Sequence, residues 1–208
     1  MVLKTPKTGD IRPTQDRVRE AVFNIIRNEV PGCDFLDLFA GSGAVGLEAL
    51  SRGAKSATFV EHDRRHAAVL RENVAEAEKR GVSAGACTVV CADVYRYLAA
   101  YSGPGFTVAF ADPPYALGEE RGFVGTLGVV AERGVVRPGG LFIAEAPASL
   151  DASAVPGWEL VRDRTYGRTR LCIWRLQGRA WNIPTFRKSD RRTRLKTKGC
   201  KKFFSADK

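Results

Sequence analysis

The sequence predicts an α/β fold in which a doubly wound, Rossmann-like parallel sheet ends in an antiparallel hairpin. Short apolar runs alternate with stretches of helical periodicity, and the turn Gly41-x-Gly43-x-x-Gly46 follows the first run and opens a helical stretch. The last two apolar runs lie too close together for a helix between them. Strands separated by helices form right-handed crossovers, so most of the sheet is expected to be parallel.

The order of the elements follows from the apolar spacing. Apolar residues at helical spacing predict a first helix over residues 14–28, which the Pro31-Gly32 pair breaks. A Pro138-Gly139-Gly140 turn is expected just before the fifth strand. The expected strands are 35–39, 56–60, 88–91, 107–111 and 141–144, and the expected helices are 44–51, 64–80, 94–100 and 119–133.

Two further strands are expected after the parallel part of the sheet. Residues 158–161 and 170–176 form strand-like runs that the turn-prone Tyr166-Gly167 pair joins. We expect them to form an antiparallel pair at the edge of the sheet. Five parallel strands followed by a terminal hairpin are the layout of the seven-stranded methyltransferase fold.

The charge distribution indicates one domain followed by a basic tail. We expect a domain over residues 1–178, which starts with a lead-in and helix over 1–30, and a tail over 179–208. Of the net charge of +10, the tail supplies +9, because it holds 11 Lys and Arg against two Asp. A basic tail is attracted to polyanions, and its aromatic residues can stack on single-stranded RNA. The alternative is a disordered solubilising tail.

Composition excludes several classes of protein. The apolar runs are far shorter than the roughly 20 residues that span a bilayer. No signal-peptide pattern is found, so we expect a cytoplasmic protein with no membrane partner. The five scattered cysteines argue against a disulfide framework. The pairs His62/His66 and Cys87/Cys91 are not expected to converge, so no metal site is predicted.

Acidic residues at three successive predicted strands indicate a nucleotide-like cofactor. Asp37 precedes the glycine turn and can meet the amino acid portion of S-adenosyl-L-methionine, directly or through water. Glu61 can accept from two ribose hydroxyls, as in NAD sites, and Asp93 can accept from the adenine amine. The alternative for strand-end acids is helix capping. The expected cofactor-binding residues are Asp37, Phe39, Ala40, Gly41, Gly43, Glu61, His62, Asp93 and Val94.

A second motif, Asp112-Pro113-Pro114-Tyr115, follows the predicted strand 107–111. An exocyclic amine of a base is weakly nucleophilic, and a carboxylate with a main-chain carbonyl can orient its lone pair toward a methyl group. The prolines stiffen the loop, and Tyr115 offers a face for stacking on the base. The alternative is a proline turn after a strand. Together with the cofactor motif, these four catalytic candidates predict methyl transfer to an exocyclic nitrogen of a nucleic-acid base.

With these residues in view, the chain resembles the bacterial methyltransferases that modify guanine N2 in small-subunit (16S) ribosomal RNA. The likeness spans about residues 11–176 and includes the opening Arg12-Pro-Thr-Gln-Asp-Arg-Val-Arg-Glu20. It implies a ribosomal RNA (guanine-N2-)-methyltransferase whose partner is ribosomal RNA or an assembling small ribosomal subunit, and we expect the protein to be a monomer. By this resemblance, residues 112–115 hold the guanine amine, and Arg12, Thr14 and Arg17 lie beside the cofactor or the RNA.

Two alternatives stay open. DNA adenine methyltransferases share the Asp-Pro-Pro-Tyr signature, so adenine N6 or cytosine N4 in DNA is an alternative acceptor. The other alternative is a non-catalytic RNA-binding protein built on a methyltransferase fold.

Overall fold

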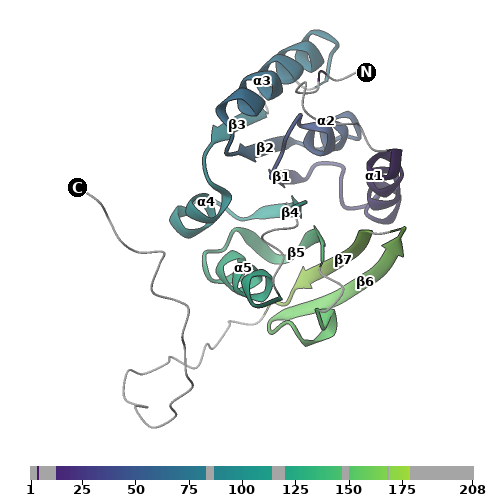
Figure 1. Cartoon of the computed structure of the whole chain (residues 1–208), viewed down its shortest axis with the longest axis vertical. Coiled ribbons are helices and arrows are strands. Elements are labelled where there is room, and N and C mark those ends of the chain that lie inside the picture. Colours follow the sequence, from purple (N-terminus) through teal and green to yellow (C-terminus); the bar gives the residue numbers. More distant parts are fainter. Residues whose placement is uncertain are drawn as a thin grey trace, which may run out of the picture.

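A computed structural model describes Lys4 and residues 13–82, 87–113, 120–146, 150–167 and 169–178 (Figure 1). The helices are α1 (Pro13–Ile25), α2 (Ala44–Ser51), α3 (Arg64–Lys79), α4 (Val94–Ala100) and α5 (Glu120–Glu132), with a short 3-10 helix η2 (Ala152–Ala154). The strands are β1 (Asp34–Leu38), β2 (Ser56–Glu61), β3 (Cys87–Cys91), β4 (Phe106–Ala111), β5 (Val136–Glu145), β6 (Trp158–Tyr166) and β7 (Thr169–Leu176).

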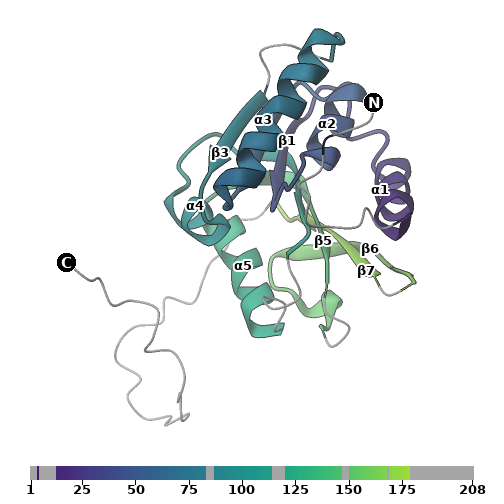
Figure 2. The same ribbon diagram turned by 45° about the horizontal axis from the view of Figure 1, so that its top comes forward.

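The seven strands form one mixed sheet in the order β3-β2-β1-β4-β5-β7-β6. Strands β1 to β5 pair in parallel, whereas β7 is antiparallel to both β5 and β6. Figure 2 shows this hairpin continuing the sheet beyond β5. The predicted fold class is confirmed, including the terminal hairpin at the edge.

Helices cover both faces of the sheet and create two apolar cores. On one face, α4 and α5 bury Leu98 and Leu127 against the strands. On the other face, α1, α2 and α3 bury Val22, Leu47 and Leu70. Figure 1 shows this division, with α4 and α5 on the opposite side of the sheet from α1 and α2. The central strands are therefore buried on both faces, which explains their nearly continuous apolar sequences.

The fifth strand differs from its prediction. It begins at Val136, so Pro138, Gly139 and Gly140 lie inside the strand instead of forming a turn before it. The pairing with β4 jumps from Phe106↔Val136 to Val108↔Leu141. A bulge of this kind tolerates proline, which has no N–H for the ladder, and Gly139 supplies a φ of 79°. The sequence signals for a turn and for a bulge are the same.

The hairpin is also longer than predicted. Strand β6 runs to Tyr166, which pairs with Thr169 at the start of β7. The connection is therefore two residues, and Tyr166 belongs to the strand instead of the turn. The first helix is shorter than predicted, since α1 ends at Ile25.

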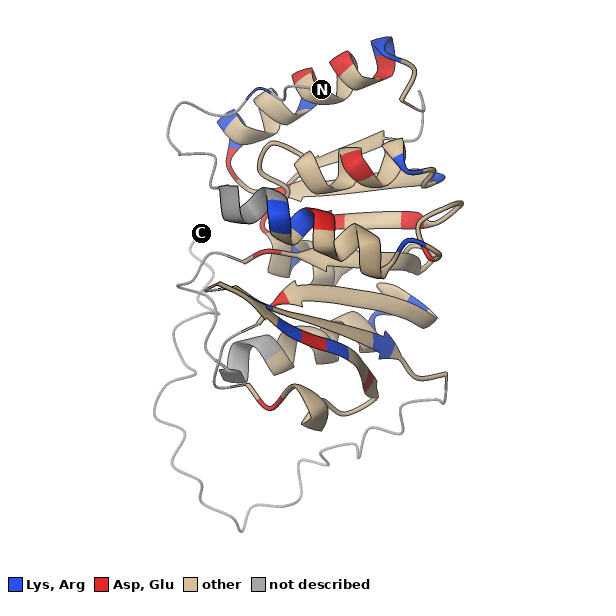
Figure 3. Ribbon diagram, turned by 90° about the vertical axis from the view of Figure 1, so that its right-hand side faces the viewer, with Lys and Arg blue, Asp and Glu red and all other residues tan. Residues whose placement is uncertain are grey.

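Charged residues are distributed over the outer elements in both signs. Figure 3 shows Lys and Arg interspersed with Asp and Glu on α1, α3 and the β6–β7 hairpin. Among the described residues, no helix combines the length and the apolar composition needed to cross a bilayer.

The sheet order reverses between β1 and β4. From β1 the chain winds outward to β2 and β3, and it then returns to β4 on the other side of β1. Loops leave the carboxyl ends of β1 and β4 toward opposite sides at such a switch point, which opens a crevice for ligands. The glycine turn follows β1 and the Asp112–Tyr115 motif follows β4, so both predicted motifs begin at this switch point.

Candidate active site

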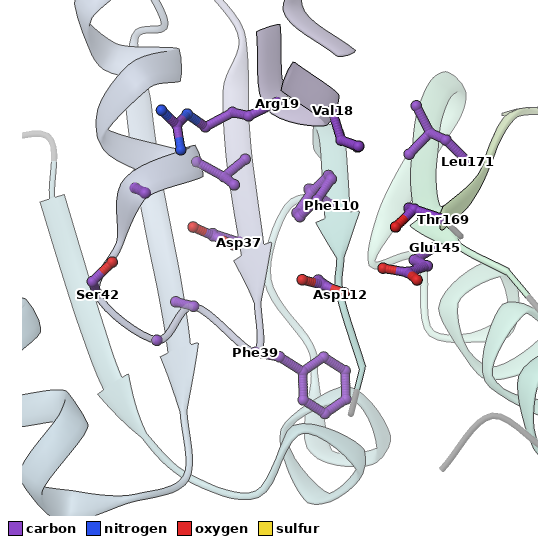
Figure 4. Close-up of a pocket in the computed structure, with 14 residues that line it drawn as sticks. Val18, Arg19, Asp37, Phe39, Ser42, Phe110, Asp112, Glu145, Thr169 and Leu171 are labelled. Carbon is purple, nitrogen blue, oxygen red and sulfur yellow. The ribbon is translucent and has the colours of Figure 1, made fainter. Parts of the chain in front are cut away.

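A cavity of about 250 Å³ lies at the carboxyl ends of β1 and β4. Its wall comes from α1, β1, the glycine turn, β4, β5 and β7, as Figure 4 shows. The residues that line it are Val18, Arg19, Asp37, Phe39, Ala40, Gly41, Ser42, Ala44, Val45, Phe110, Asp112, Glu145, Thr169 and Leu171. The two sequence motifs, which are far apart along the chain, therefore share one cavity.

Asp37 is a buried carboxyl group in this wall. Only 2% of the residue is exposed, and its Oδ2 accepts a hydrogen bond of 2.9 Å from the Gly46 N–H at the start of α2. Loss of solvent raises the pKa of Asp37 to about 8, and the carboxyl groups of Asp112 and Glu61 add to the rise. The Gly46 N–H opposes it. The site therefore holds a carboxyl group that a bound cation would help to ionise.

The three glycines of the turn have different roles. Gly41 has a φ of 54°, lines the cavity, and a Cβ there would meet no atom within 4 Å. A Cβ at Gly43 would lie 2.3 Å from Leu70 Cδ1, and one at Gly46 would lie 2.3 Å from Phe59 Cε1. Gly43 and Gly46 thus permit close packing of α2 on the sheet and α3, while Gly41 leaves space beside the ligand cavity.

Phe39 shows a further backbone feature of the site. It is the first residue after β1, it lines the cavity, and its φ of 61° lies in the left-handed region. Such a conformation is uncommon outside glycine and concentrates at functional sites. Its ring packs edge-on against Tyr95, with a centroid distance of 6.2 Å.

Glu61 is engaged with the backbone of the cofactor turn. Its Oε2 accepts from the Gly41 N–H at 2.9 Å and its Oε1 from the Asp63 N–H at 2.8 Å. The side chain is buried and holds the glycine turn in place. It does not line the cavity. Its predicted contact with ribose hydroxyls stays a prediction.

The remaining cofactor candidates lie around this edge without lining the cavity. Asp93 caps α4, with its Oδ1 accepting from the Arg96 N–H at 2.9 Å, which is the alternative weighed for this acid. Val94 is buried in the core, and His62 is exposed. Their roles toward a cofactor also stay predictions.

Asp112 and Glu145 form a pair of neighbouring carboxyl groups. Asp112 directly follows β4 and Glu145 ends β5, and both line the cavity. Burial is the first cause that raises the pKa of Asp112, followed by a hydrogen bond and charge repulsion from Glu145. Pro113, the next residue of the motif, is half-buried, whereas Pro114 and Tyr115 lie outside the described residues.

Nine of the cavity-lining residues were not among the predicted site residues, and three of them are Glu145, Arg19 and Thr169. Glu145 follows the same rule of acids at strand ends that singled out Asp37, Glu61 and Asp93, so this rule applied to the fifth strand predicts it. Arg19 lines the cavity from α1 and donates from its Nε to Glu48 Oε2 at 2.6 Å. Thr169 comes from the start of β7, and no sequence signal indicates it.

The predicted RNA contacts are placed only in part. Arg17 is exposed on α1 and does not line the cavity. Arg12 lies outside the described residues, and for Thr14 the structure describes the backbone, which is helical. The basic tail, residues 179–208, also lies outside the described residues.

Comparison with known proteins places the chain in a family. The family model described as conserved hypothetical protein 95 matches residues 1–175. Ribosomal RNA small subunit methyltransferase D of Escherichia coli (strain K12) is 34% identical over 175 residues, which are 83% of each chain. The chain therefore belongs to the conserved hypothetical protein 95 family, as the matched residues and this relative show.

Solved structures agree with this membership. The Escherichia coli protein yhhF has a TM-score of 0.72 and 32% identity, over 85% of this chain and 92% of that chain. A hypothetical protein of Thermus thermophilus has a TM-score of 0.66 and 36% identity, over 83% of this chain and 92% of that chain. The family resemblance stated from the sequence is confirmed, and so is the α/β methyltransferase fold.

Proposed function

We propose that the chain transfers a methyl group from S-adenosyl-L-methionine to the exocyclic N2 amine of a guanine in small-subunit ribosomal RNA. The observation that carries this proposal is the meeting of Asp37, the glycine turn and Asp112 in one cavity. The name of the Escherichia coli relative supports ribosomal RNA as the substrate class. The base and its position in the RNA rest on the resemblance of the motifs.

The cavity suits S-adenosyl-L-methionine in charge. The cofactor carries a sulfonium and an ammonium group, and the buried carboxyl group of Asp37 lies in the cavity wall. Space beside Gly41 admits a ligand close to the backbone. The residues that would hold the cofactor are Asp37, the glycine turn, Glu61 and Asp93. When bound, the cofactor supplies an electrophilic methyl group on its sulfonium.

Asp112 would orient and deprotonate the amine. Its carboxylate accepts a hydrogen bond from N2–H and turns the nitrogen lone pair toward the methyl group. As the new N–C bond forms and the S–C bond breaks, the N2 proton passes to Asp112, so that a neutral methylated guanine is released. The raised pKa of Asp112 makes its carboxylate a stronger proton acceptor than an exposed one.

The RNA would approach along α1. A paired target base must leave its stack to reach Asp112 inside the cavity. Arg19 in the wall and Arg17 on the exposed face of α1 place two guanidinium groups on the approach side, where phosphates can bind. Arg19 already pairs with Glu48, so it is held in a defined position.

Transfer of labelled methyl to small ribosomal subunits that lack modification tests the proposal. We expect the label in N2-methylguanosine. Asp112→Asn should lower the rate by about 100-fold or more, because it removes the proton acceptor, and leave cofactor binding measured by calorimetry unchanged. Asp163→Asn on the exposed strand β6 is the matched control and should keep the wild-type rate.

Because Asp112 acts as the carboxylate, the methylation rate should rise with pH and level off above the raised pKa of Asp112.

DNA is offered as a parallel acceptor in the same assay. Label in a DNA adenine or cytosine would overturn the ribosomal RNA assignment. A protein that binds the cofactor but labels neither nucleic acid would overturn the proposed reaction.

A further inference from the structure

Sheet register brings Glu145 next to Asp112. Strands β4 and β5 pair in parallel, with Ala111 opposite Ala144, so the next residue along each strand is a carboxylic acid. Both side chains line the cavity, and Figure 4 shows their carboxyl groups side by side. The neighbouring Glu145 contributes to the raised pKa of Asp112. The two carboxyl groups therefore stand together at the point where the proposed function places the target base.

The other groups at the cavity set its charge. Asp37 enters from β1 as a third carboxyl group, Arg19 enters from α1, and Thr169 brings a hydroxyl group from β7. Each carboxyl group carries several oxygen lone pairs, so the pair presents neighbouring hydrogen-bond acceptors to a ligand.

The edge of each base differs in what it offers to such a pair. Guanine presents the N1–H and the N2 amine side by side, which are two donors. Adenine presents its N6 amine beside N1, and cytosine presents its N4 amine beside N3, so each offers one donor and one acceptor. Two neighbouring acceptors therefore complement guanine, whereas the other two bases would direct a ring-nitrogen lone pair at a carboxyl oxygen.

We propose that Glu145 is the residue that selects guanine, by accepting the N1–H hydrogen bond while Asp112 accepts from the N2 amine. This inference rests on the proposed function and deepens it. It also separates this chain from enzymes that share the Asp-Pro-Pro-Tyr signature but act on adenine. A site built to pair a donor discriminates strongly against a base that lacks it, because its polar groups are left unpaired.

The test uses a base that keeps the N2 amine and loses the N1–H. 2-Aminopurine riboside has an acceptor at N1. The target guanosine is mapped in unmodified subunits, and RNA carrying either guanosine or 2-aminopurine riboside at that position is made by ligation and assembled into particles. Wild-type protein should prefer guanosine by roughly 10- to 100-fold, the range for a hydrogen bond to a charged group.

Substitution of Glu145 should remove this preference. Glu145→Gln can donate from its amide to the N1 of 2-aminopurine, so the preference should fall to within about threefold. Glu145→Asp keeps the carboxylate and should keep the direction of the preference. Glu159→Gln, the same change on exposed strand β6, is the matched control and should behave as wild type.

A second readout does not depend on methyl transfer. 2-Aminopurine fluoresces more strongly when it leaves its stack, so its emission reports entry of the base into the cavity. Glu145→Gln should raise this emission above the wild-type level. Cofactor affinity should stay the same in all variants, which verifies the fold.

The outcomes separate the two proposals. Wild-type protein that methylates guanosine, with the same preference retained by Glu145→Gln, overturns the role of Glu145 alone. Wild-type protein that labels no guanosine overturns the proposed function, and the inference with it. If Glu145→Gln loses cofactor binding, the 2-aminopurine emission and the guanosine preference are measured with Glu145→Asp instead. Loss of the guanosine preference in Glu145→Asp would then overturn the inference.

Discussion

At the scale of single residues, Asp37 places an ionisable carboxyl group in a buried position. It is held by one N–H of α2, in a cavity that also contains Asp112 and Glu145. Without a cation nearby, an ionised carboxylate in this place is unfavourable, because it loses water and faces other carboxyl groups. Residues of this kind lower stability in exchange for ligand binding, which is why buried acids concentrate at functional sites.

Asp37→Asn should therefore stabilise the ligand-free protein as pH rises. The pKa of Asp37 rises from 3.8 to about 8 on folding, so the folded state binds the proton more tightly than the unfolded state. The contribution of Asp37 to the free energy of unfolding is fully present below pH 4 and is lost as pH rises through about 8. The asparagine does not titrate, so the variant should exceed wild type by a margin on the order of a few kcal/mol at pH 8 and match it near pH 4.

Urea unfolding at several pH values measures this difference. Asp163→Asn is the control of opposite sign, because Arg170 lowers the pKa of Asp163. That variant should lose stability relative to wild type at pH 8 and approach it at low pH. A difference between Asp37→Asn and wild type that does not change with pH would contradict the buried, protonated state of Asp37.

At the scale of elements, the position of α2 depends on two glycines. The helix starts directly after Gly43, packs on Phe59 of β2 through Gly46, and directs the Gly46 N–H at Asp37. A larger residue at position 46 would push α2 away from the sheet and move this N–H. The buried Asn73 of α3 supports the same turn, since its Nδ2 donates to the Ser42 carbonyl at 2.9 Å.

Gly46→Ala and Gly125→Ala should change stability in opposite directions. The new methyl group at position 46 would lie 2.3 Å from Phe59 Cε1, so overpacking should cost about 1–3 kcal/mol. Gly125 lies inside α5, and a Cβ there meets no atom within 4 Å, so alanine should stabilise by about 0.5–1 kcal/mol. Thermal or urea unfolding measures both. Equal effects of the two substitutions would contradict the close packing of α2 on β2.

At the scale of the whole molecule, charge and chemistry are separated along the chain. Residues 1–178 hold 22 basic and 21 acidic side chains, while the following 30 residues carry a net charge of +9. The cavity itself is rich in carboxyl groups. We therefore propose that the basic tail attracts an RNA chain, while in the cavity Asp37 favours the cationic cofactor and the Asp112–Glu145 pair favours the donor groups of a base.

Removal of residues 179–208 should weaken RNA binding in a salt-dependent way. The slope of log affinity against log salt should fall by about 0.7 for each phosphate of single-stranded RNA that the tail neutralises in the full chain. Melting temperature and cofactor affinity should stay unchanged, because the last strand of the described residues ends at Leu176. Filter binding across a salt series measures the slope. An unchanged slope would mean that the tail does not bind the RNA.

Much of the fold could be predicted because its signals are local. Helices α2 and α4 begin and end at the predicted residues, and the strands of the parallel part were each located. The errors occurred where one signal has two structural outcomes. Pro138-Gly139-Gly140 suits a turn and also a bulge, and the pairing with β4 decides between them.

The sequence by itself determined the fold class, the family and five of the residues that meet in the cavity, which are Asp37, Phe39, Ala40, Gly41 and Asp112. These follow from apolar periodicity and from motifs that are contiguous along the chain. Only the tertiary structure decided that Glu145 stands beside Asp112, and that Glu61 holds the glycine turn through backbone N–H groups. The reason is physical: periodicity reports which face of an element is buried, whereas contacts between side chains depend on the order and register of the strands.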